Sequence, residues 1–107
     1  MDYRDKADQI YNSGFNCCQG VIGAFAEALH MDFQEVMALA SGFGGGMGKS
    51  GEVCGAFSGL VMAVSKQYGY FSPAEEPEKK KEIYQIVTDY MERFKAEYAG
   101  CITCRAL

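Results

Sequence analysis

Apolar side chains recur every three or four residues along most of the chain, which is the spacing of one face of an α-helix. Five segments carry this spacing or helical end signals, and none shows the strict alternation of a half-buried strand. They lie at about residues 2–11, 16–30, 32–40, 52–67 and 72–99. The pattern therefore predicts an all-α fold, a single compact bundle of about five helices.

Capping residues mark where the second and third helices begin. Asn16 precedes Gln19 by three residues, and Asp32 precedes Glu35 by the same interval. In this arrangement the first side chain caps the helix start, and the second can reach back to the cap. The sequence therefore predicts helix starts directly after Asn16 and Asp32. The second helix should end near His30, where a cation at a helix C-terminus has a structural role.

The start of the last helix has two possible positions. Residues Ser72 to Glu75 offer a cap, a proline at the first helical position and a capping glutamate. Pro77 allows a later start instead. Gly69 and Gly100 are suited to ending the fourth and fifth helices.

Residues 41–51 contain six glycines in eleven residues and are expected to form a loop between the third and fourth helices. The loop includes Gly48, Lys49 and Ser50, which resemble the end of a phosphate-binding P-loop. That motif requires a glycine five residues before Gly48, where this chain has Phe43. The sequence therefore argues against nucleotide binding, although the backbone N–H groups of the loop could still bind an anion.

The composition is that of one globular domain, covering residues 1–107. Hydrophobic residues make up 49% of the chain, yet no apolar run approaches the ~18 residues of a membrane span. The charged N-terminal residues do not resemble a signal peptide, so we expect a cytoplasmic protein. The net charge is −4, and the lysines at 79–81 are interspersed with glutamates, so nucleic-acid binding is not expected.

Five cysteines provide the candidate chemistry: Cys17, Cys18, Cys54, Cys101 and Cys104. In a reducing compartment such thiols are free, bind metals or form transient redox disulfides. The predicted helix starts place Cys17 and Cys18 in the first turn of the second helix, and Cys54 in the first turn of the fourth. Helix N-termini favour the thiolate, which attacks disulfides and binds metals. Buried cysteine also commonly only fills space, and this interpretation suits Cys18, because its neighbour already supplies a sulfur.

Gly55 and Gly59 lie four residues apart, on one face of the predicted fourth helix, next to Cys54. Glycine inside a helix costs about 1 kcal/mol relative to alanine, so a compensating role is expected. One interpretation is close packing against another helix. The alternative is that the bare face leaves room for a cofactor or for a second cysteine.

The pair Cys101-x-x-Cys104 has a spacing that lets two sulfurs converge on one metal or close a redox disulfide. No histidine follows it, no βαβ pattern surrounds it, and no second Cys-x-x-Cys accompanies it. Covalent haem attachment, a thioredoxin-type site and an ordinary zinc ribbon are therefore not expected.

These elements occur in the order of a known family. The segments that carry the resemblance are Asn16–Gln19, Gly42–Gly48, Cys54–Gly59 and Cys101–Cys104. Together they resemble the C-GCAxxG-C-C family of redox-active proteins, which is related to a domain of split-Soret cytochromes. The resemblance covers the chain from about Tyr11 to Leu107. It implies redox chemistry at the four cysteines that match the family pattern, Cys17, Cys54, Cys101 and Cys104, and members usually have a small residue in place of Cys18.

Three functions remain open from the sequence. In the first, Cys17, Cys54, Cys101 and Cys104 converge on one redox or metal centre for electron transfer, holding an iron–sulfur cluster or zinc. The glycines expected to give such a centre space are Gly45, Gly46, Gly55 and Gly59.

In the second function, the protein is a thiol–disulfide oxidoreductase without a cofactor, in which Cys101 and Cys104 cycle and Cys54 or Cys17 is the partner thiol. The third is a non-catalytic helical interaction module with passive cysteines. A redox partner protein or a small-molecule thiol is the expected partner for the first two, and a homodimer is possible.

Overall fold

The computed structural model describes residues 2–97, and Met1 and residues 98–107 lie outside the described part. The described part consists of helices joined by turns and contains no strand, which confirms the all-α prediction. The helices are α1 (Tyr3–Asn12), α2 (Cys17–Ala26), α3 (Phe33–Ala40), the short 3-10 helix η1 (Ser41–Phe43), α4 (Gly55–Tyr68) and α5 (Lys79–Glu97).

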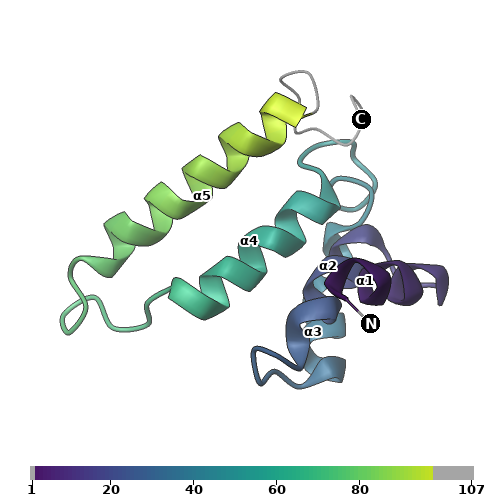
Figure 1. Ribbon diagram of the computed structural model, residues 1–107, viewed down its shortest axis with the longest axis horizontal. Helices are drawn as coiled ribbons and strands as arrows, with labels where there is room; N and C mark the ends of the chain where they lie inside the picture. Colours follow the sequence, from purple (N-terminus) through teal and green to yellow (C-terminus); the bar gives the residue numbers. More distant parts are fainter. Residues whose placement is uncertain (1, 98–107) are drawn as a thin grey trace.

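Helix α2 lies at the centre of the fold, in contact with α1, α3 and α4. Helix α5 runs back antiparallel along α4, so that α4 and α5 form a long hairpin beside the other helices (Figure 1). The core forms where α2, α3 and α4 meet, and its buried residues are Cys18, Ile22, Val36, Met37, Ala40 and Ala63. This arrangement brings the starts of α2 and α4 to the same region as η1.

The predicted helix starts in the first third of the chain are confirmed by the observed caps. The Asn16 side chain accepts a hydrogen bond from the Gln19 N–H (2.8 Å), and the Gln19 side chain accepts one from the Asn16 N–H (2.9 Å). Asp32 caps α3 by accepting from the Glu35 N–H at 3.0 Å. Asp2 caps α1 in the same way, through the Asp5 N–H at 2.8 Å. Each cap satisfies N–H groups that a helix start leaves without a partner.

Helix α2 ends at Ala26, four residues before the predicted end near His30, and residues 27–30 form a turn that closes it. The His30 N–H donates to the Glu27 carbonyl at 3.1 Å, and the Met31 N–H donates to the Ala26 carbonyl at 2.8 Å. His30 has a φ of +57°, so these two bonds form the left-handed closing turn of a Schellman motif. His30 therefore has a structural role in its backbone, and its side chain is exposed.

Two predicted helix starts were wrong. Helix α4 begins at Gly55 rather than near residue 52, because the Gly51 and Glu52 N–H groups are bonded to the carbonyls of Gly45 and Gly46 in the loop. Helix α5 begins at Lys79, later than both positions considered.

Pro77 lacks an N–H and disfavours helical backbone in the residue before it, which explains why the helix starts after it. The Ser72 carbonyl accepts a hydrogen bond from the Glu76 N–H at 2.9 Å, within a turn that precedes the helix. Gly69 does end α4, as predicted.

The glycine-rich segment forms the predicted loop, but its backbone is unusually regular. Residues 45–49 all have a positive φ, between +59° and +74°, so they form one left-handed turn. Two of these five residues, Met47 and Lys49, are not glycine. A left-handed conformation costs an L-residue about 1–2 kcal/mol, so the loop stores strain beside the start of α4.

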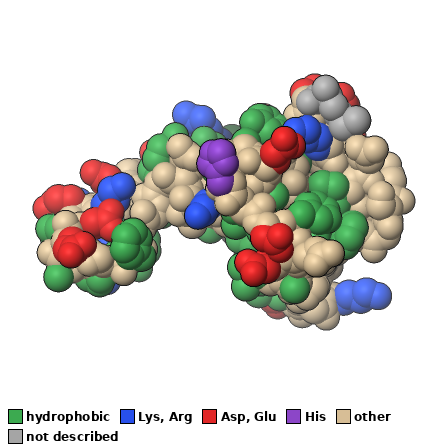
Figure 2. All heavy atoms as spheres, turned by 90° about the horizontal axis from the view of Figure 1, so that it is seen from below, with side chains coloured by type: hydrophobic (Ala, Val, Ile, Leu, Met, Phe, Trp, Pro, Cys, Tyr) green, Lys and Arg blue, Asp and Glu red, His purple; other side chains and the backbone are tan. Residues whose placement is uncertain are grey.

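Acidic and basic side chains gather at the end of the molecule formed by the turn between α4 and α5 (Figure 2). Lys79 and Glu76 form an ion pair there at 3.7 Å. The lysine-rich segment is thus a mixed, solvated surface, as its sequence indicated. Among the described residues, no helix is long and apolar enough to cross a membrane.

Candidate functional site

Cys17 is the first residue of α2, and Asn16 fixes its position. Besides capping α2, the Asn16 side-chain amide donates a hydrogen bond to the Ser41 carbonyl of η1 at 3.0 Å. The Gln19 amide donates to the Met37 carbonyl at 2.7 Å, in the buried core. The start of α2 is therefore tied to α3 and η1 by polar contacts that hold the Cys17 backbone in place.

The Cys17 sulfur lies directly against Gly55, the first residue of α4. A Cβ atom at Gly55 would collide with Cys17 Sγ, and it would lie 3.1 Å from the Phe43 carbonyl oxygen and 3.2 Å from the Cys18 nitrogen. Because Gly55 follows Cys54 in the chain, this contact brings Cys17 to the residue next to Cys54. The space at Gly55 is thus filled by a second cysteine, Cys17. This was one of the alternatives that the sequence left open for the glycine face.

Gly59 has the other role. A Cβ atom there would lie 2.8 Å from the Cys18 carbonyl oxygen and 2.9 Å from Val21 Cβ, both in α2. The glycine face of α4 therefore serves two purposes, one turn apart. At Gly59 it lets the helices pack closely and leaves no room for a cofactor, and at Gly55 it admits the Cys17 sulfur.

Cys54 is the N-cap residue of α4, one position before the first turn in which it was predicted. The later start of α4 described above accounts for the shift. The Cys54 side chain makes no capping hydrogen bond within the described residues, and Cys54 is half-buried. The N–H groups of a first helical turn lack helical partners and carry positive partial charge. Since α2 and α4 both begin here, the backbone of two helices favours negative charge at the junction of their starts, called the cysteine junction below.

Cys18 is fully buried and points away from this junction into the core. Its thiol donates to the Met62 sulfur at 3.9 Å. Burial, with a smaller contribution from neighbouring Cys17, raises the pKa of Cys18 from 9.0 to about 11. Cys18 therefore stays a protonated thiol at neutral pH, which supports its interpretation as a space-filling residue.

Cys101 and Cys104 lie outside the described residues, so their predicted part in the site stays a prediction. The end of α5 that precedes them lies beside the start of α4, because the Phe57 and Phe94 rings pack with centroids 5.3 Å apart. Within residues 2–97, no three His, Cys, Asp or Glu side chains are grouped so that they could hold a metal ion. The described part thus contributes two thiols, Cys17 and Cys54, to the junction.

Gly45 and Gly46 belong to the left-handed turn that leads into α4, and Gly46 is buried. The sequence did not single out Gly44, although a Cβ atom there would lie 2.5 Å from the Asn16 Cβ. The sequence also did not predict the hydrogen bond between Asn16 and Ser41. Both contacts join residues more than twenty positions apart. The one sequence signal for either contact was the glycine at position 44, which allows a close approach.

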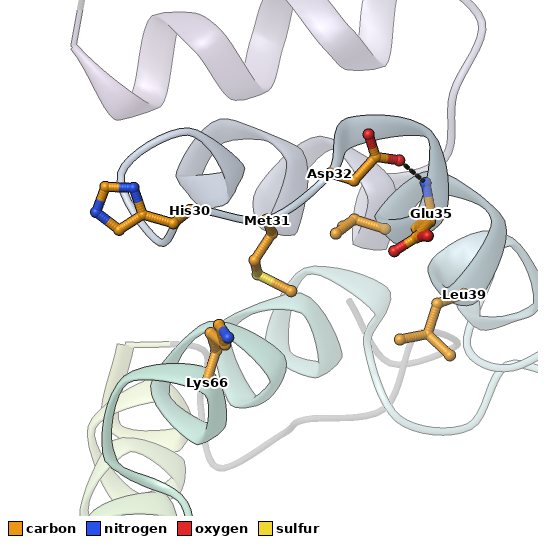
Figure 3. A pocket seen from close by; sticks show the side chains of 7 residues that line it. His30, Met31, Asp32, Glu35, Leu39 and Lys66 are labelled. Carbon is orange, nitrogen blue, oxygen red and sulfur yellow. Dashed lines mark hydrogen bonds between the residues drawn. The ribbon is translucent and has the colours of Figure 1, made fainter.

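Apart from the cysteine junction, a hollow lies between the start of α3 and α4 (Figure 3). Its lining includes His30, Asp32, Glu35, Leu39 and Lys66. It measures about 280 Å³, and no cysteine lines it. Asp32 is occupied in capping α3, as the dashed line in Figure 3 marks. This hollow is therefore separate from the cysteine junction.

Comparisons with known proteins agree with the chemistry of the junction. Residues 15–107 match the family described as "Putative redox-active protein (C_GCAxxG_C_C)". A protein of Archaeoglobus fulgidus described as an "Uncharacterized protein" is 31% identical over 106 residues, which is 94% of this chain and 64% of the relative. The chain thus spans a little under two thirds of that relative's length, and no solved structure matches it. Because the family model covers residues 15–107, this chain belongs to the C-GCAxxG-C-C family.

Proposed function

We propose that this protein is an electron-transfer protein whose redox centre is built at the cysteine junction from Cys17, Cys54, Cys101 and Cys104. The observation that carries this proposal is the contact of the Cys17 sulfur with Gly55, the residue next to Cys54. Two cysteines that are 37 positions apart, counted from 17 to 54, thereby share one site at the starts of two helices. A passive role for these cysteines does not explain why a bare glycine receives the sulfur.

The chain length after α5 supports the participation of the terminal pair. Cys101 is four residues beyond Glu97, and Cys104 is seven beyond it. At no more than about 3.6 Å per residue, these lengths allow a reach of roughly 14 Å and 25 Å. The last turns of α5 pack against the first turn of α4 through Phe94 and Phe57, so the reach begins near Cys54.

The donor set fits an iron–sulfur cluster, the cofactor we favour. Four thiolates are the usual ligands of [2Fe–2S] and [4Fe–4S] clusters, and zinc also accepts four thiolates. Cys17, Cys54, Cys101 and Cys104 would hold the cluster, which when bound would accept and donate single electrons. The role of the protein is to position the ligands, and the N–H groups at the start of α4 place positive partial charge beside them.

Thiol–disulfide exchange is the second candidate, and the exposure of the two described thiols favours it. Cys17 and Cys54 are half-buried rather than enclosed, so a disulfide can approach them. In this reaction the thiolate of Cys17 or Cys54 attacks a disulfide between Cys101 and Cys104, forming a mixed disulfide with one of these sulfurs while the other leaves as a thiolate. A disulfide of a partner protein or a small molecule supplies the oxidation: it gains two electrons and two protons as Cys101 and Cys104 lose them.

Anaerobic purification separates the two candidates. We expect iron and inorganic sulfide in stoichiometric amounts, a visible absorption band that bleaches on reduction, and loss of the band in each single Cys→Ser variant of the four ligands. Cys18→Ser is the matched control, because its sulfur lies in the core and its variant should keep the metal.

Protein free of iron and zinc, in which mild oxidation removes thiols reversibly in pairs, would instead support disulfide chemistry. Protein without metal, whose thiols are lost neither in pairs nor reversibly, would overturn both.

A further inference from the structure

One face of the α4–α5 hairpin presents a continuous aromatic surface. Two adjoining hollows, each of about 300 Å³, share Tyr68 and Tyr90. The first extends across α1, α2 and α4, and the second lies along α5. This surface, called the aromatic face below, comprises Tyr3, Phe25, Leu29, Leu60, Val64, Tyr68, Ile86, Asp89, Tyr90 and Arg93, among others.

Fewer residues of helix α5 are buried than the apolar stripe in its sequence contains. Its apolar stripe includes Ile86, Tyr90 and Phe94, yet Ile83 is the one residue of α5 that is buried in the described structure. Helix α5 has its main contact with α4 only, while α4 also packs on α2. Among residues 2–97, the apolar stripe of α5 is therefore wider than the contact that covers it, and its exposed edge borders the aromatic face.

We propose that a second copy of this chain docks on the aromatic face to form a two-fold symmetric dimer. Tyrosine and arginine are enriched at the centres of protein interfaces, because they combine large apolar area with a polar end. Here Tyr68 is 51% exposed and Tyr3 is 47% exposed. Tyr3 also stacks on Phe25, with ring centroids 4.5 Å apart, which holds this part of the face rigid.

The charges at the edge of the face favour a second copy as the occupant. Asp89 and Arg93 lie one turn apart on α5, and both line the second hollow. Arg93 stacks on the Tyr90 ring at 5.7 Å, and Asp89 accepts a hydrogen bond from Gln85 at 2.9 Å, so they do not pair with each other. Under two-fold symmetry, Asp89 of each copy can face Arg93 of the other. The same surface on each copy then contributes one acidic and one basic side chain, so that two symmetric ion pairs form across the interface.

Sedimentation velocity of the full chain tests the proposal, with reductant present so that intermolecular disulfides do not form. We expect a dimer at micromolar concentration. Tyr68→Glu should weaken association at least tenfold, and so should Arg93→Asp or Asp89→Arg alone. The double exchange Asp89→Arg/Arg93→Asp should restore dimerisation, because the pairs reform with reversed polarity.

Leu39→Glu is the matched control, since Leu39 is 67% exposed on α3 and lies outside the aromatic face. Its dimer should match that of the wild type. Far-ultraviolet circular dichroism confirms that each variant is folded. A wild-type chain that stays monomeric at 100-fold higher concentration would overturn the proposal, and so would a dimer that is insensitive to Tyr68→Glu and to both single charge reversals.

Discussion

Replacing Gly55 with alanine tests the contact that defines the cysteine junction. The added Cβ would meet the Cys17 sulfur, the Phe43 carbonyl oxygen at 3.1 Å and the Cys18 nitrogen at 3.2 Å. The two backbone atoms are held by the caps of α2 and by η1, so they have little room to move. The sulfur can rotate about χ1. We therefore expect the Cys17 side chain to leave its position against α4.

The effect on stability is the balance of two opposing terms. Alanine is favoured over glycine by about 1 kcal/mol within a helix, and by less at its first residue. Inserting a methyl group into filled space costs about 1–3 kcal/mol. The expected net change in the unfolding free energy is a loss of about 0–3 kcal/mol. The variant should stay folded, so its chemistry can be measured.

Urea unfolding measures the stability, and mass spectrometry after timed alkylation measures each thiol separately. Cys17 should be alkylated faster in Gly55→Ala than in the wild type, and metal content or reversible thiol oxidation should fall with it. Gly59→Ala is the matched control: its Cβ would meet the Cys18 carbonyl oxygen at 2.8 Å, so it should lose stability while Cys17 reacts as in the wild type. The reasoning would be refuted if Gly55→Ala were more stable by the full helix-propensity gain with unchanged Cys17 reactivity.

Three further predictions follow from buried or strained groups. Because burial raises the pKa of Cys18 from 9.0 to about 11, the unfolded chain loses this proton first as the pH rises. The unfolding free energy should therefore fall between pH 9 and 11, by about 2–3 kcal/mol more in the wild type than in Cys18→Ala. Urea unfolding at several pH values measures this decrease, and an equal decrease in the two proteins would contradict the prediction. Asn16→Ala removes the α2 cap and the bond to Ser41, and it should cost about 1–3 kcal/mol in urea unfolding. Asp32→Ala loses only one exposed cap bond, so an equal or larger cost there would argue against a linking role for Asn16. Met47 has a φ of +69° and is 43% exposed, so Met47→Gly should raise the unfolding free energy by about 0.5–1 kcal/mol, whereas a lower thermal midpoint would show that Met47 contributes packing.

Local patterns determined much of this fold. The caps at Asn16 and Asp32 were predictable because a capping side chain binds N–H groups only two or three residues away. The all-α class was predictable for a similar reason, because the helical spacing of apolar residues is a pattern among residues three or four positions apart. The start of α5 was not predictable, because two proline signals competed within a few residues.

The sequence also identified cysteine as the candidate chemistry and set Cys18 apart from the other thiols. What it left undecided was the role of the glycines beside Cys54. Gly55 and Gly59 are equivalent in local pattern, yet one receives the Cys17 sulfur and the other lets α2 and α4 pack closely. Only the crossing of α2 over α4 distinguishes them, and that crossing depends on contacts between residues more than thirty positions apart.

The start of α4 was likewise decided by tertiary structure. Hydrogen bonds from Gly51 and Glu52 back to Gly45 and Gly46 hold the chain in the loop, so that Cys54 becomes a cap rather than part of the first turn. By itself, the sequence determined which helices form and identified cysteine as the candidate chemistry, because both depend on nearest neighbours and residue type. The tertiary structure decided that the Cys17 sulfur lies against Gly55, the residue after Cys54, and that Cys18 is buried in the core, because burial and helix crossing depend on the whole fold.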